Sequence, residues 1–535
     1  MIGPIAIAAF IVAVAALAWV RLHTLLTYFQ QEEYDGSRFV GAVWRVRLFD
    51  IRASLVLAVL AILRLALPAS PDVFFWALLV GGALIAWFAW REHAYVYKKP
   101  LALTERARRI LNVAMALSAV IVVGAALVGP FATLIALQLL PLTLIAANAI
   151  LSPLQERVNE GYVAEAREKL ARMDPVRIGI TGSFGKTTTK HIFAEILGLS
   201  GPVFYSKGSI NTVLGLTRHI RERLQWSHRY FIAEMGAYGI GSVARLCDFV
   251  KPTYGMVTAI GDAHTERFGS VENIAKAKSE LVEAVCENGG SAVIADQIME
   301  YEPFRLLHEK YPGQVIRVGR GENADIAITG ADLRDAAWHI TLSDRRKDPA
   351  FDTVEYEMPL LGEHNVMNSA LAVAMALVID PEARDRIPLV TPDVEQVPHR
   401  LQKRESPGEP LVLDDAYNAN ELGFRNAVEV AAALAKERGG RAILVTPGIA
   451  ELGLEHDRVH TGLGEFAAQH MDLIFAVNPS RIETFTAALA DAGMPAREVA
   501  SFADARTALK GEAKPDDVLL YANDLPDLLE ERRLL

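Results

Sequence analysis

The sequence predicts an α/β protein with N-terminal transmembrane helices, then a P-loop parallel-sheet domain and a C-terminal Rossmann-like domain. Three observations support this prediction. The first 150 residues are dominated by apolar side chains, a glycine loop near residue 182 lies between an apolar strand and a helix, and short apolar strands alternate with helical segments from residue 388 onward. Such alternation is typical of parallel sheets covered by helices.

The length of 535 residues exceeds that of one typical domain, for which about 150 residues is usual. We therefore divide the chain into a membrane module at 1–150, a helical connector at 151–175, a central domain at 176–387 and a C-terminal domain at 388–535. The mean hydropathy of +0.21 comes from the membrane module, since the rest carries nearly all the acidic residues.

Charge and cysteine content argue against several classes of protein. The net charge of −10, without a long Lys/Arg run, gives no indication of nucleic acid as a partner. Cys247 and Cys286 are the only cysteines and lack C-x-x-C spacing. They fit a reducing cytoplasm and argue against a disulfide framework or a zinc site.

Five apolar stretches predict about five transmembrane helices. They cover residues 2–20, 53–67, 73–90, 110–128 and 131–150, and most approach the roughly 20 residues that span hydrocarbon. The second is short and contains Arg64, whose side chain can reach the interface. A cleavable signal peptide is the alternative for the first stretch, but no basic segment precedes it, which favours a retained anchor. The residues leave open whether these helices only anchor the chain or also bind substrate.

Basic residues in alternate loops predict an orientation. Arg21, Arg38, Arg45, Arg47 and Arg52 follow the first stretch, and Arg91, Lys98, Lys99, Arg106, Arg108 and Arg109 follow the third. The loops at 68–72 and 129–130 contain no Lys or Arg. Because basic loops face the cytoplasm, we expect a multi-pass protein of the cytoplasmic (inner) membrane, with its N-terminus outside and everything beyond residue 150 in the cytoplasm.

The segment after residue 175 has the order of elements that a phosphate-binding loop requires. A β-branched strand at 176–181 is followed by Gly182-Ser183-Phe184-Gly185-Lys186-Thr187-Thr188 and then by a helix. Glycines let backbone N–H groups approach an anion, and the helix N-terminus adds its dipole. We expect Lys186 to contact the β and γ phosphates of ATP and Thr187 to offer a hydroxyl to Mg²⁺.

The loop alone is weakly specific. A G-x-x-G-K-T segment also arises by chance, and the longer G-x-x-x-x-G-K-T form is not met because Ile180 occupies the position of its first glycine. The strand before the loop and the helix after it favour phosphate binding over chance.

Further motifs resemble, in their order, those of the Mur ligase family, whose enzymes add amino acids or dipeptides to peptidoglycan precursors. The resemblance covers most of the chain from residue 176 onward and is strongest to the MurF-type branch, which adds D-Ala-D-Ala. Besides the glycine loop, the motifs are Asn211-Thr212, Ala233-Glu234-Met235-Gly236, Ala263-His264, Ala275-Lys276-Ala277-Lys278, Gly362-Glu363-His364-Asn365-Val366-Met367-Asn368, His399-Arg400-Leu401-Gln402 and Asp414-Asp415-Ala416-Tyr417-Asn418-Ala419-Asn420.

The resemblance implies a metal site in the central domain. Glu234 and His264 each follow an apolar strand, so both are expected at the carboxyl ends of parallel strands, where α/β sheets place ligands. With Thr187, they can hold divalent metal. By similarity to the family, Lys278 reacts with CO₂ to form a carbamate that holds a second Mg²⁺. The residues alone leave His264 open as a solvated loop histidine and Lys278 as a surface lysine paired along its helix.

The resemblance also assigns residues to the nucleotide and the substrates. Gly182, Ser183, Gly185 and Thr188 are expected around the phosphates, His364, Asn365 and Asn368 near the adenine, Arg400 and Asp415 at the nucleotide, and Asn211, Tyr417 and Asn418 at the substrates. Domain closure is expected to bring the C-terminal residues in and to exclude water. Those after residue 360 are equally consistent with structural roles as caps or hinges.

The family reaction agrees with these residues. ATP phosphorylates a carboxylate to an acyl phosphate, which an amine then attacks, while Lys186 and two Mg²⁺ ions neutralise charge. The resemblance therefore implies an ATP-dependent acid–amino-acid ligase of peptidoglycan precursor synthesis. Its partners are ATP, an amino-acid or dipeptide amine, a carboxylate acceptor and membrane lipid.

Three features depart from the family pattern. The segment Ala292-Val293-Ile294-Ala295-Asp296 lacks the usual Asn before its Asp, and Tyr521-Ala522-Asn523-Asp524 stands where MurF-type enzymes read Lys-Gly-Ser. The membrane module takes the place of the UDP-sugar-binding domain of soluble members. A lipid-linked acceptor is thus an alternative to a UDP-linked one, with basic loops near Lys98 and Arg106 attracting its phosphate headgroup.

Two other functions stay open at this point. A membrane-bound polyglutamate-type ligase combines an apolar N-terminus with the same core, and a catalytically silent scaffold for cell-envelope enzymes needs no chemistry. Retention of Lys186, Glu234, His264 and Lys278 together argues against the scaffold.

Overall fold

The structure, a computed structural model, divides the chain into two compact units. The described residues are 2–32, 34–45, 50–66, 71–95, 101–261, 268–334, 337–416, 421–449, 452 and 455–523. Of these, the residues up to Asn159 form one unit and those from Glu160 onward form the other. The first consists of helices, and the second contains two sheets covered by helices.

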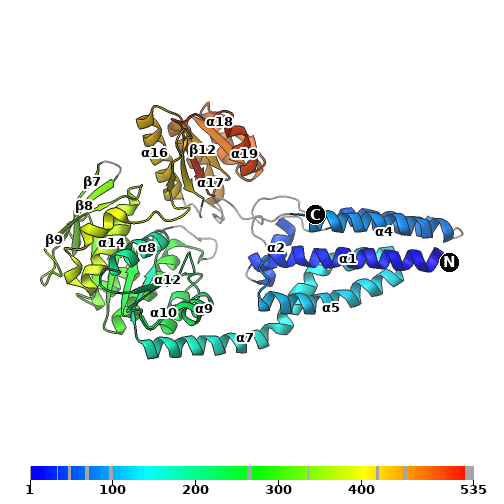
Figure 1. The fold of residues 1–535 in the computed structure, drawn as a ribbon, viewed down its shortest axis with the longest axis horizontal. Coiled ribbons are helices and arrows are strands. Elements are labelled where there is room, and N and C mark those ends of the chain that lie inside the picture. The colour runs from blue at the N-terminus through cyan, green and yellow to red at the C-terminus, as the bar shows by residue number, and fades with distance from the viewer. Residues whose placement is uncertain are drawn as a thin grey trace. The chain divides into compact units, whose positions relative to one another are not determined.

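The described residues of the helical unit form six helices and the start of a seventh. They are α1 (Ile2–Gln31), α2 (Gly36–Arg45), α3 (Arg52–Ala66), α4 (Pro71–His93), α5 (Glu105–Val128), α6 (Pro130–Gln138) and α7 (Leu140–Met173), which continues into the second unit. α1 packs against α4 and α5, and α3 packs against α4 and α6. Figure 1 shows α1, α4 and α5 side by side.

Fewer helices can span a membrane than the five expected. Among the described residues, Gly3–Gln31, Pro71–His93 and Glu105–Val128 are long and apolar enough, and α6 with α7 adds a fourth span if this pair, bent by 50°, counts as one. The second expected span, α3, has 15 residues. At 1.5 Å per residue it is about 22 Å long, less than the roughly 30 Å of hydrocarbon in a bilayer.

Several arginines expected in loops lie within helices instead. α1 continues to Gln31, so Arg21 belongs to the helix, and Arg91 and Arg106 belong to α4 and α5. The hydropathy pattern ends where the first polar side chain appears, whereas the helix continues because its hydrogen bonds do not depend on side-chain polarity.

Large apolar side chains cover the outside of the helical unit as well as its core. Phe10, Leu17 and Phe29 are buried. Outward-facing ones include Val12, Leu55, Ile62, Trp76, Val80, Trp87, Val120 and Phe131, each more than a third exposed. Helices that are apolar on all sides are typical of membrane spans, so this surface supports placement in a bilayer.

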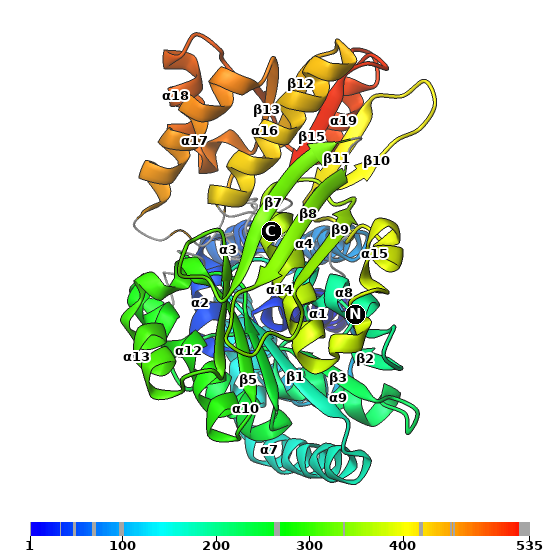
Figure 2. The same cartoon turned by 90° about the vertical axis from the view of Figure 1, so that its left-hand side faces the viewer.

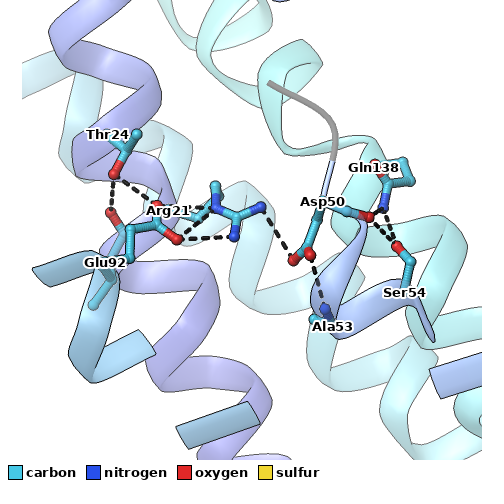
Figure 3. Close-up of polar contacts among 8 residues, drawn as sticks. Arg21, Thr24, Asp50, Ala53, Ser54, Glu92 and Gln138 are labelled. Atoms are coloured by element: carbon cyan, nitrogen blue, oxygen red, sulfur yellow. Dashed lines mark hydrogen bonds and ion pairs between the residues drawn. The ribbon is translucent and has the colours of Figure 1, made fainter. Parts of the chain in front are cut away.

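Arg21 lies at the centre of a buried charged cluster (Figure 3). Its guanidinium donates two hydrogen bonds to the Glu92 carboxylate, at 3.0 and 2.8 Å, and forms an ion pair with Asp50 at 3.1 Å. Thr24 donates to Glu92 at 2.7 Å, and Asp50 accepts from the Ala53 N–H at 2.9 Å. Because buried charges are costly unless paired, this cluster ties α1, α4 and the start of α3 together.

The first sheet of the second unit has nine strands in the order β2-β3-β1-β4-β5-β6-β7-β8-β9. They are β1 (Val176–Thr181), β2 (Val203–Tyr205), β3 (Tyr230–Glu234), β4 (Tyr254–Val257), β5 (Ser291–Ala295), β6 (Val315–Gly319), β7 (Ile326–Arg334), β8 (Ala337–Asp344) and β9 (Thr353–Met358). The pairs from β2 to β7 are parallel, as expected, whereas β7, β8 and β9 are antiparallel. Figure 2 shows these three strands side by side.

Helices cover this sheet and fix the position of the glycine loop. They are α8 (Lys186–Leu197), α9 (Val213–Arg223), α10 (Ser242–Val250), α12 (Val271–Glu287), α13 (Glu302–Lys310), α14 (His364–Ile379) and the short α15 (Ile387–Val390). α8 packs against α14, and α12 packs against α10 and β4. β1 lies between β3 and β4, so the loop that follows β1 starts in the middle of the parallel part.

The second sheet has six strands in the order β10-β11-β15-β12-β13-β14. Its elements are β10 (Gln402–Arg404), β11 (Leu411–Asp415), α16 (Glu421–Arg438), β12 (Ala442–Thr446), α17 (His456–His470), β13 (Leu473–Val477), α18 (Glu483–Asp491), β14 (Arg497–Val499), α19 (Phe502–Leu509) and β15 (Val518–Ala522). All pairs are parallel except β10 with β11. Side chains of α16, α17 and α18 join one hydrophobic core and those of α19 another, so helices cover both faces.

Candidate active site

The glycine loop joins β1 to α8, as the sequence predicts. A Cβ atom on Gly182 would lie 1.9 Å from the Thr258 hydroxyl, and one on Gly185 would lie 2.3 Å from the Asn368 side chain. Gly185 also has a φ of 77°, which favours glycine. The loop therefore packs tightly at the N-terminus of α8, an arrangement that binds phosphate.

Two lysine side chains converge on one backbone carbonyl of this loop. Lys186 donates to the Gly182 oxygen at 2.6 Å, and Lys278, which α12 brings from 96 residues away, donates to the same oxygen at 3.0 Å. Neither lysine has a carboxylate within 4 Å among the described residues. The base of the loop thus brings two amine groups together, and no described carboxylate contacts either of them.

Burial changes the protonation of both lysines. It lowers the pKa of Lys186 to about 8, although the nearby Glu234 carboxylate opposes the shift. It also lowers the pKa of Lys278 well below its ordinary value, and the charge of Lys186 adds to this effect. Lys278 is 4% exposed, so the alternative of a surface lysine paired along its helix is wrong. A lysine whose pKa is lowered is neutral in a larger fraction of molecules than an ordinary lysine, and a neutral amine is nucleophilic.

Thr187 and Glu234 come together on the other side of the loop. Their side-chain oxygens are 3.1 Å apart, because α8 starts beside the end of β3. Oxygen donors from one carboxylate and one hydroxyl, together with substrate phosphates, suit Mg²⁺. These two residues therefore fit one of the magnesium ions that the family resemblance implies, although no group of three His, Cys, Asp or Glu side chains forms within the described part of the chain.

Lys190 is a site residue that the sequence did not reveal. Its ammonium lies 2.8 Å from the Glu234 carboxylate, with both side chains at most 1% exposed. It also donates to the Gly208 carbonyl at 2.5 Å. The lysine stands one helical turn after Lys186, a spacing that could have indicated it, but its partner Glu234 lies 44 residues away in the sequence. Lys190 holds Glu234 in place beside Thr187.

Asn211 also reaches Glu234, as part of a chain of side chains. Its amide nitrogen lies 3.4 Å from the second carboxylate oxygen, and its amide oxygen accepts from the Tyr238 hydroxyl at 2.9 Å. Asn211, predicted to contact substrate, thus lies beside Glu234 in the structure.

A cleft of about 570 Å³ opens beside the loop. Seven of the predicted residues line this cleft: Gly185, Thr188, His364, Asn365, Asn368, Arg400 and Asp415. Its volume lies within the range usual for small-molecule sites. The structure therefore brings these predicted cofactor residues from both sheets of the second unit around one space.

The first turn of α14 connects to the glycine loop through amide side chains. Asn368 accepts from the Thr189 hydroxyl at 3.3 Å and donates to Asn365 at 2.9 Å. Asn365 in turn donates to the Leu361 carbonyl at 2.6 Å. His364 begins the helix and faces the cleft. These hydrogen bonds connect the first turn of α14 to the start of α8, next to the glycine loop.

The linker before the second sheet places Arg400 at the cleft, and the end of β11 places Asp415 there. Asp415 ends β11 and accepts from the Leu401 N–H at 3.0 Å. Burial raises the pKa of the Asp415 carboxyl to about 6, although Arg400 opposes the shift. Asn523, which departs from the family pattern, donates its backbone N–H to the Asp415 carbonyl at 3.1 Å. Asn523, at the C-terminal end of β15, is thus hydrogen-bonded to a residue that lines the cleft.

Several cleft residues were not predicted from the sequence. Asp296, which follows Ala295 where the family usually carries Asn, lines the cleft and pairs with Arg317, whose Nε lies 2.8 Å away. Gln297, Arg320, Leu422 and Asn426 line it as well. No local motif marks them, since loops from separate strands and α16 bring them together.

Three predicted residues lie outside the described residues. They are His264, Tyr417 and Asn418, so their roles stay predictions. Gly182, Ser183, Lys186, Thr187, Glu234 and Lys278 are all described and lie at or next to the loop. Ser183 contributes there by exchanging hydrogen bonds with Gly261, at 3.2 and 3.1 Å.

Comparison with known proteins places both sheets of the second unit in one family. The model of the Mur ligase middle domain matches residues 180–376, and that of the Mur ligase, glutamate ligase domain matches residues 399–523. These matched regions contain the glycine loop, Lys278 and Asp415.

Curated relatives give the same result. The chain is 31% identical over 306 residues to the UDP-N-acetylmuramoyl-tripeptide--D-alanyl-D-alanine ligase of Escherichia coli, covering 57% of this chain and 65% of that enzyme. It is 30% identical over 366 residues to the Mycobacterium leprae enzyme of the same name, covering 64% and 70%. The match to the first of these thus spans just under two thirds of the relative's length.

A solved structure supports the fold. MurF from Acinetobacter baumannii superposes with a TM-score of 0.56 at 27% identity, covering 68% of this chain and 76% of that one. Sequence motifs, domain matches and structure therefore agree, and the chain belongs to the Mur ligase family.

Proposed function

We propose that this protein is a membrane-tethered, ATP-dependent amide ligase of peptidoglycan precursor synthesis that works through an acyl-phosphate intermediate. Its reaction is MurF-like, the addition of D-Ala-D-Ala or a related amine to a muramyl peptide. The observation that carries the proposal is the pair of buried lysines, Lys186 and Lys278, which meet at the Gly182 carbonyl beside a nucleotide-sized cleft.

ATP is proposed to bind with its phosphates on the glycine loop. Lys186 would leave the Gly182 carbonyl and contact the phosphates, which supply the negative charge that the loop lacks. The base would occupy the end of the cleft near His364 and Asn365. Binding is thus expected to replace a hydrogen bond within the protein by a stronger, charge-assisted one.

Thr187 and Glu234 are proposed to hold one Mg²⁺, and a carbamate on Lys278 a second. The lowered pKa of Lys278 supports the carbamate, because only the neutral amine attacks CO₂. The carbamate would turn a buried amine into an anion. The ions, when bound, neutralise charge on the phosphoryl group, while Lys190 keeps Glu234 oriented.

The proposed reaction has two steps. A carboxylate oxygen of the acceptor attacks the γ-phosphorus, the bond to the β–γ bridging oxygen breaks, and ADP leaves. The nitrogen of the amine then attacks the acyl carbon, and phosphate leaves with both electrons of the C–O bond. Above its pKa of about 6, Asp415 offers a carboxylate at the cleft that can accept a proton from the incoming ammonium.

The helical unit supports an acceptor close to a bilayer. Its three or four candidate spans and its apolar outer surface favour a multi-pass protein of the cytoplasmic membrane, with the catalytic unit in the cytoplasm, where ATP is. The curated relatives are named for a UDP-linked acceptor. For this chain, we propose a UDP-linked or lipid-linked muramyl peptide as the acceptor.

Product analysis tests this proposal. The full-length protein in lipid nanodiscs would receive ATP, UDP-linked or lipid-linked muramyl tripeptide, and either D-Ala-D-Ala or glutamate. We expect ADP release that requires both acceptor and amine, and a product heavier by D-Ala-D-Ala. Glutamate addition would instead indicate a polyglutamate-type ligase, and ADP release unaffected by acceptor and amine would contradict ligase activity and favour the scaffold.

A further inference from the structure

Arg106, a partly buried arginine of α5 in the helical unit, has surroundings unlike those of Arg21. The guanidinium of Arg106 lies over the Tyr34 ring, 4.2 Å from its centre, and donates to the Asn148 side chain at 3.2 Å. Its Nε atom is buried without a hydrogen-bond partner among the described residues. No carboxylate in that part of the chain pairs with Arg106. Arg106 is therefore a cation that has no counter-charge among the described residues.

Arg109 lies one helical turn after Arg106 on α5 and adds a second positive charge. Both arginines line a narrow cleft between α5 and α7. Polar Asn148 and Gln155 and apolar Leu151 and Leu154 line it as well. Within the described chain, Arg109 makes no hydrogen bond or ion pair. Two guanidinium groups and two amide groups thus line this cleft, and none of the residues that line it carries a carboxylate.

The chemistry of this cleft selects an anion with several oxygen acceptors. Arginine presents its donors in a planar fork that matches phosphate. The enclosed space is about 10 Å³, which is room for one water-sized group. The cleft can therefore take one phosphate oxygen while the remainder of the ligand lies outside it.

The neighbouring surface indicates where that remainder lies. Leu103, Ile150 and Leu154 are each more than half exposed, and α5 is one of the candidate membrane spans. An arginine pair at the end of an apolar span, beside exposed leucines, is suited to a molecule with a phosphate head and apolar chains.

We propose that the cleft between α5 and α7 binds the phosphate group of an anionic membrane lipid through Arg106 and Arg109. The acyl chains lie along Ile150 and Leu154. The site rests on the membrane placement in the proposed function but not on ligase activity. A lipid-linked acceptor has the same chemistry, so this site can hold it as well.

Lipid retention measured by native mass spectrometry tests the site. The full-length protein would be released from nanodiscs of phosphatidylcholine with added phosphatidic acid, or with added oleic acid as an anion without phosphate. We expect selective retention of phosphatidic acid, reduced about fivefold by Arg106→Gln and by Arg109→Gln, since each basic residue near a membrane contributes about 1 kcal/mol.

Arg108→Gln is the matched control. It removes the same charge from the same turn of α5, but Arg108 is 62% exposed and lies 4.0 Å from Glu105, so we expect retention to be unchanged. Arg109→Gln keeps the test valid if Arg106→Gln disturbs packing, because Arg109 makes no hydrogen bond or ion pair with any described residue. Equal retention by Arg109→Gln, equal retention of oleic acid, or displacement of the lipid by inorganic phosphate would overturn the proposal. Failure of the wild-type chain to enter nanodiscs would instead overturn the membrane placement.

Discussion

Buried cations occur in both units, but their partners differ. In the helical unit, Arg21 is surrounded by the carboxylates of Glu92 and Asp50. In the catalytic unit, Lys186 and Lys278 contact only backbone carbonyls of the glycine loop among the described residues. The free energy of desolvating Arg21 is offset by two ion pairs, whereas the two lysines form no ion pair with any described residue.

This difference separates structural charges from binding charges. Lys190 belongs with Arg21, because the buried Glu234 balances it, although it stands one helical turn from Lys186. Arg106 belongs with the uncompensated group. A buried cation that lacks a protein counter-charge indicates where an anionic ligand binds.

The strongest test of the comparison is Lys186→Ala. We expect the kcat for ADP release to fall about 10³-fold, the lower end of what a cation contributes to phosphoryl transfer. The exposed Lys251, which follows α10 in the same domain, provides a control as Lys251→Ala, with unchanged kcat. Steady-state ADP release measures both, and wild-type turnover by Lys186→Ala would rule out the assigned site.

Arg21→Met tests the compensated side. It leaves Glu92 and Asp50 buried without a cation, so we expect the free energy of unfolding of the helical unit to fall by about 3 kcal/mol. Denaturation of the full-length protein in mixed micelles measures it.

Adding Glu92→Gln to Arg21→Met should restore part of the loss, because one uncompensated charge is removed. Arg64→Met, at an exposed arginine of α3, should have little effect. An unchanged stability in Arg21→Met would show that the cluster does not hold the helices together.

Lys278→Ala should lower kcat about 10²-fold, by loss of one charge-stabilising group. A short-chain carboxylate added to the assay should recover part of this activity, because it can occupy the position of the carbamate. Lys276→Ala is the control, since Lys276 is exposed on the same helix. Activity equal to wild type in Lys278→Ala would remove the lysine from the mechanism.

The smallest expected effect is a pH dependence of kcat/KM that arises from Asp415. Its carboxyl has a pKa raised to about 6, so it is protonated below pH 6 and ionised above. If the ionised form accepts the proton of the amine, kcat/KM should fall about tenfold per pH unit below pH 6. Asp415→Asn should lack this acidic limb, whereas Asp457→Asn, at an exposed residue of α17, should keep it. The same limb in both variants would assign it to another group.

The parts of the site that the sequence predicts are local in the chain. Lys186 and Thr187 follow from the order of strand, glycine loop and helix, and Glu234 from the end of an apolar strand. Each needs only its own segment and the rule that ligands bind at the carboxyl ends of parallel strands. The structure places these three residues where that rule expects them.

The parts that could not be predicted depend on contacts between distant segments. The pairing of Lys190 with Glu234 joins segments 44 residues apart, and that of Arg21 with Glu92 joins segments 71 residues apart. Hydropathy also assigned Arg21 to a loop and α3 to a span, because it measures composition and not helix length or side-chain partners. Tertiary packing decides such features.

Transfer of ¹⁸O measures the central claim most directly. The carboxylate of the muramyl tripeptide, UDP-linked or lipid-linked, would be labelled with ¹⁸O, and the phosphate released during ligation by the full-length protein would be examined by mass spectrometry. If the buried lysines position ATP for acyl-phosphate formation, one ¹⁸O atom per turnover should appear in phosphate, and Lys186→Ala should show none above background. Ligation that releases only unlabelled phosphate would contradict the mechanism.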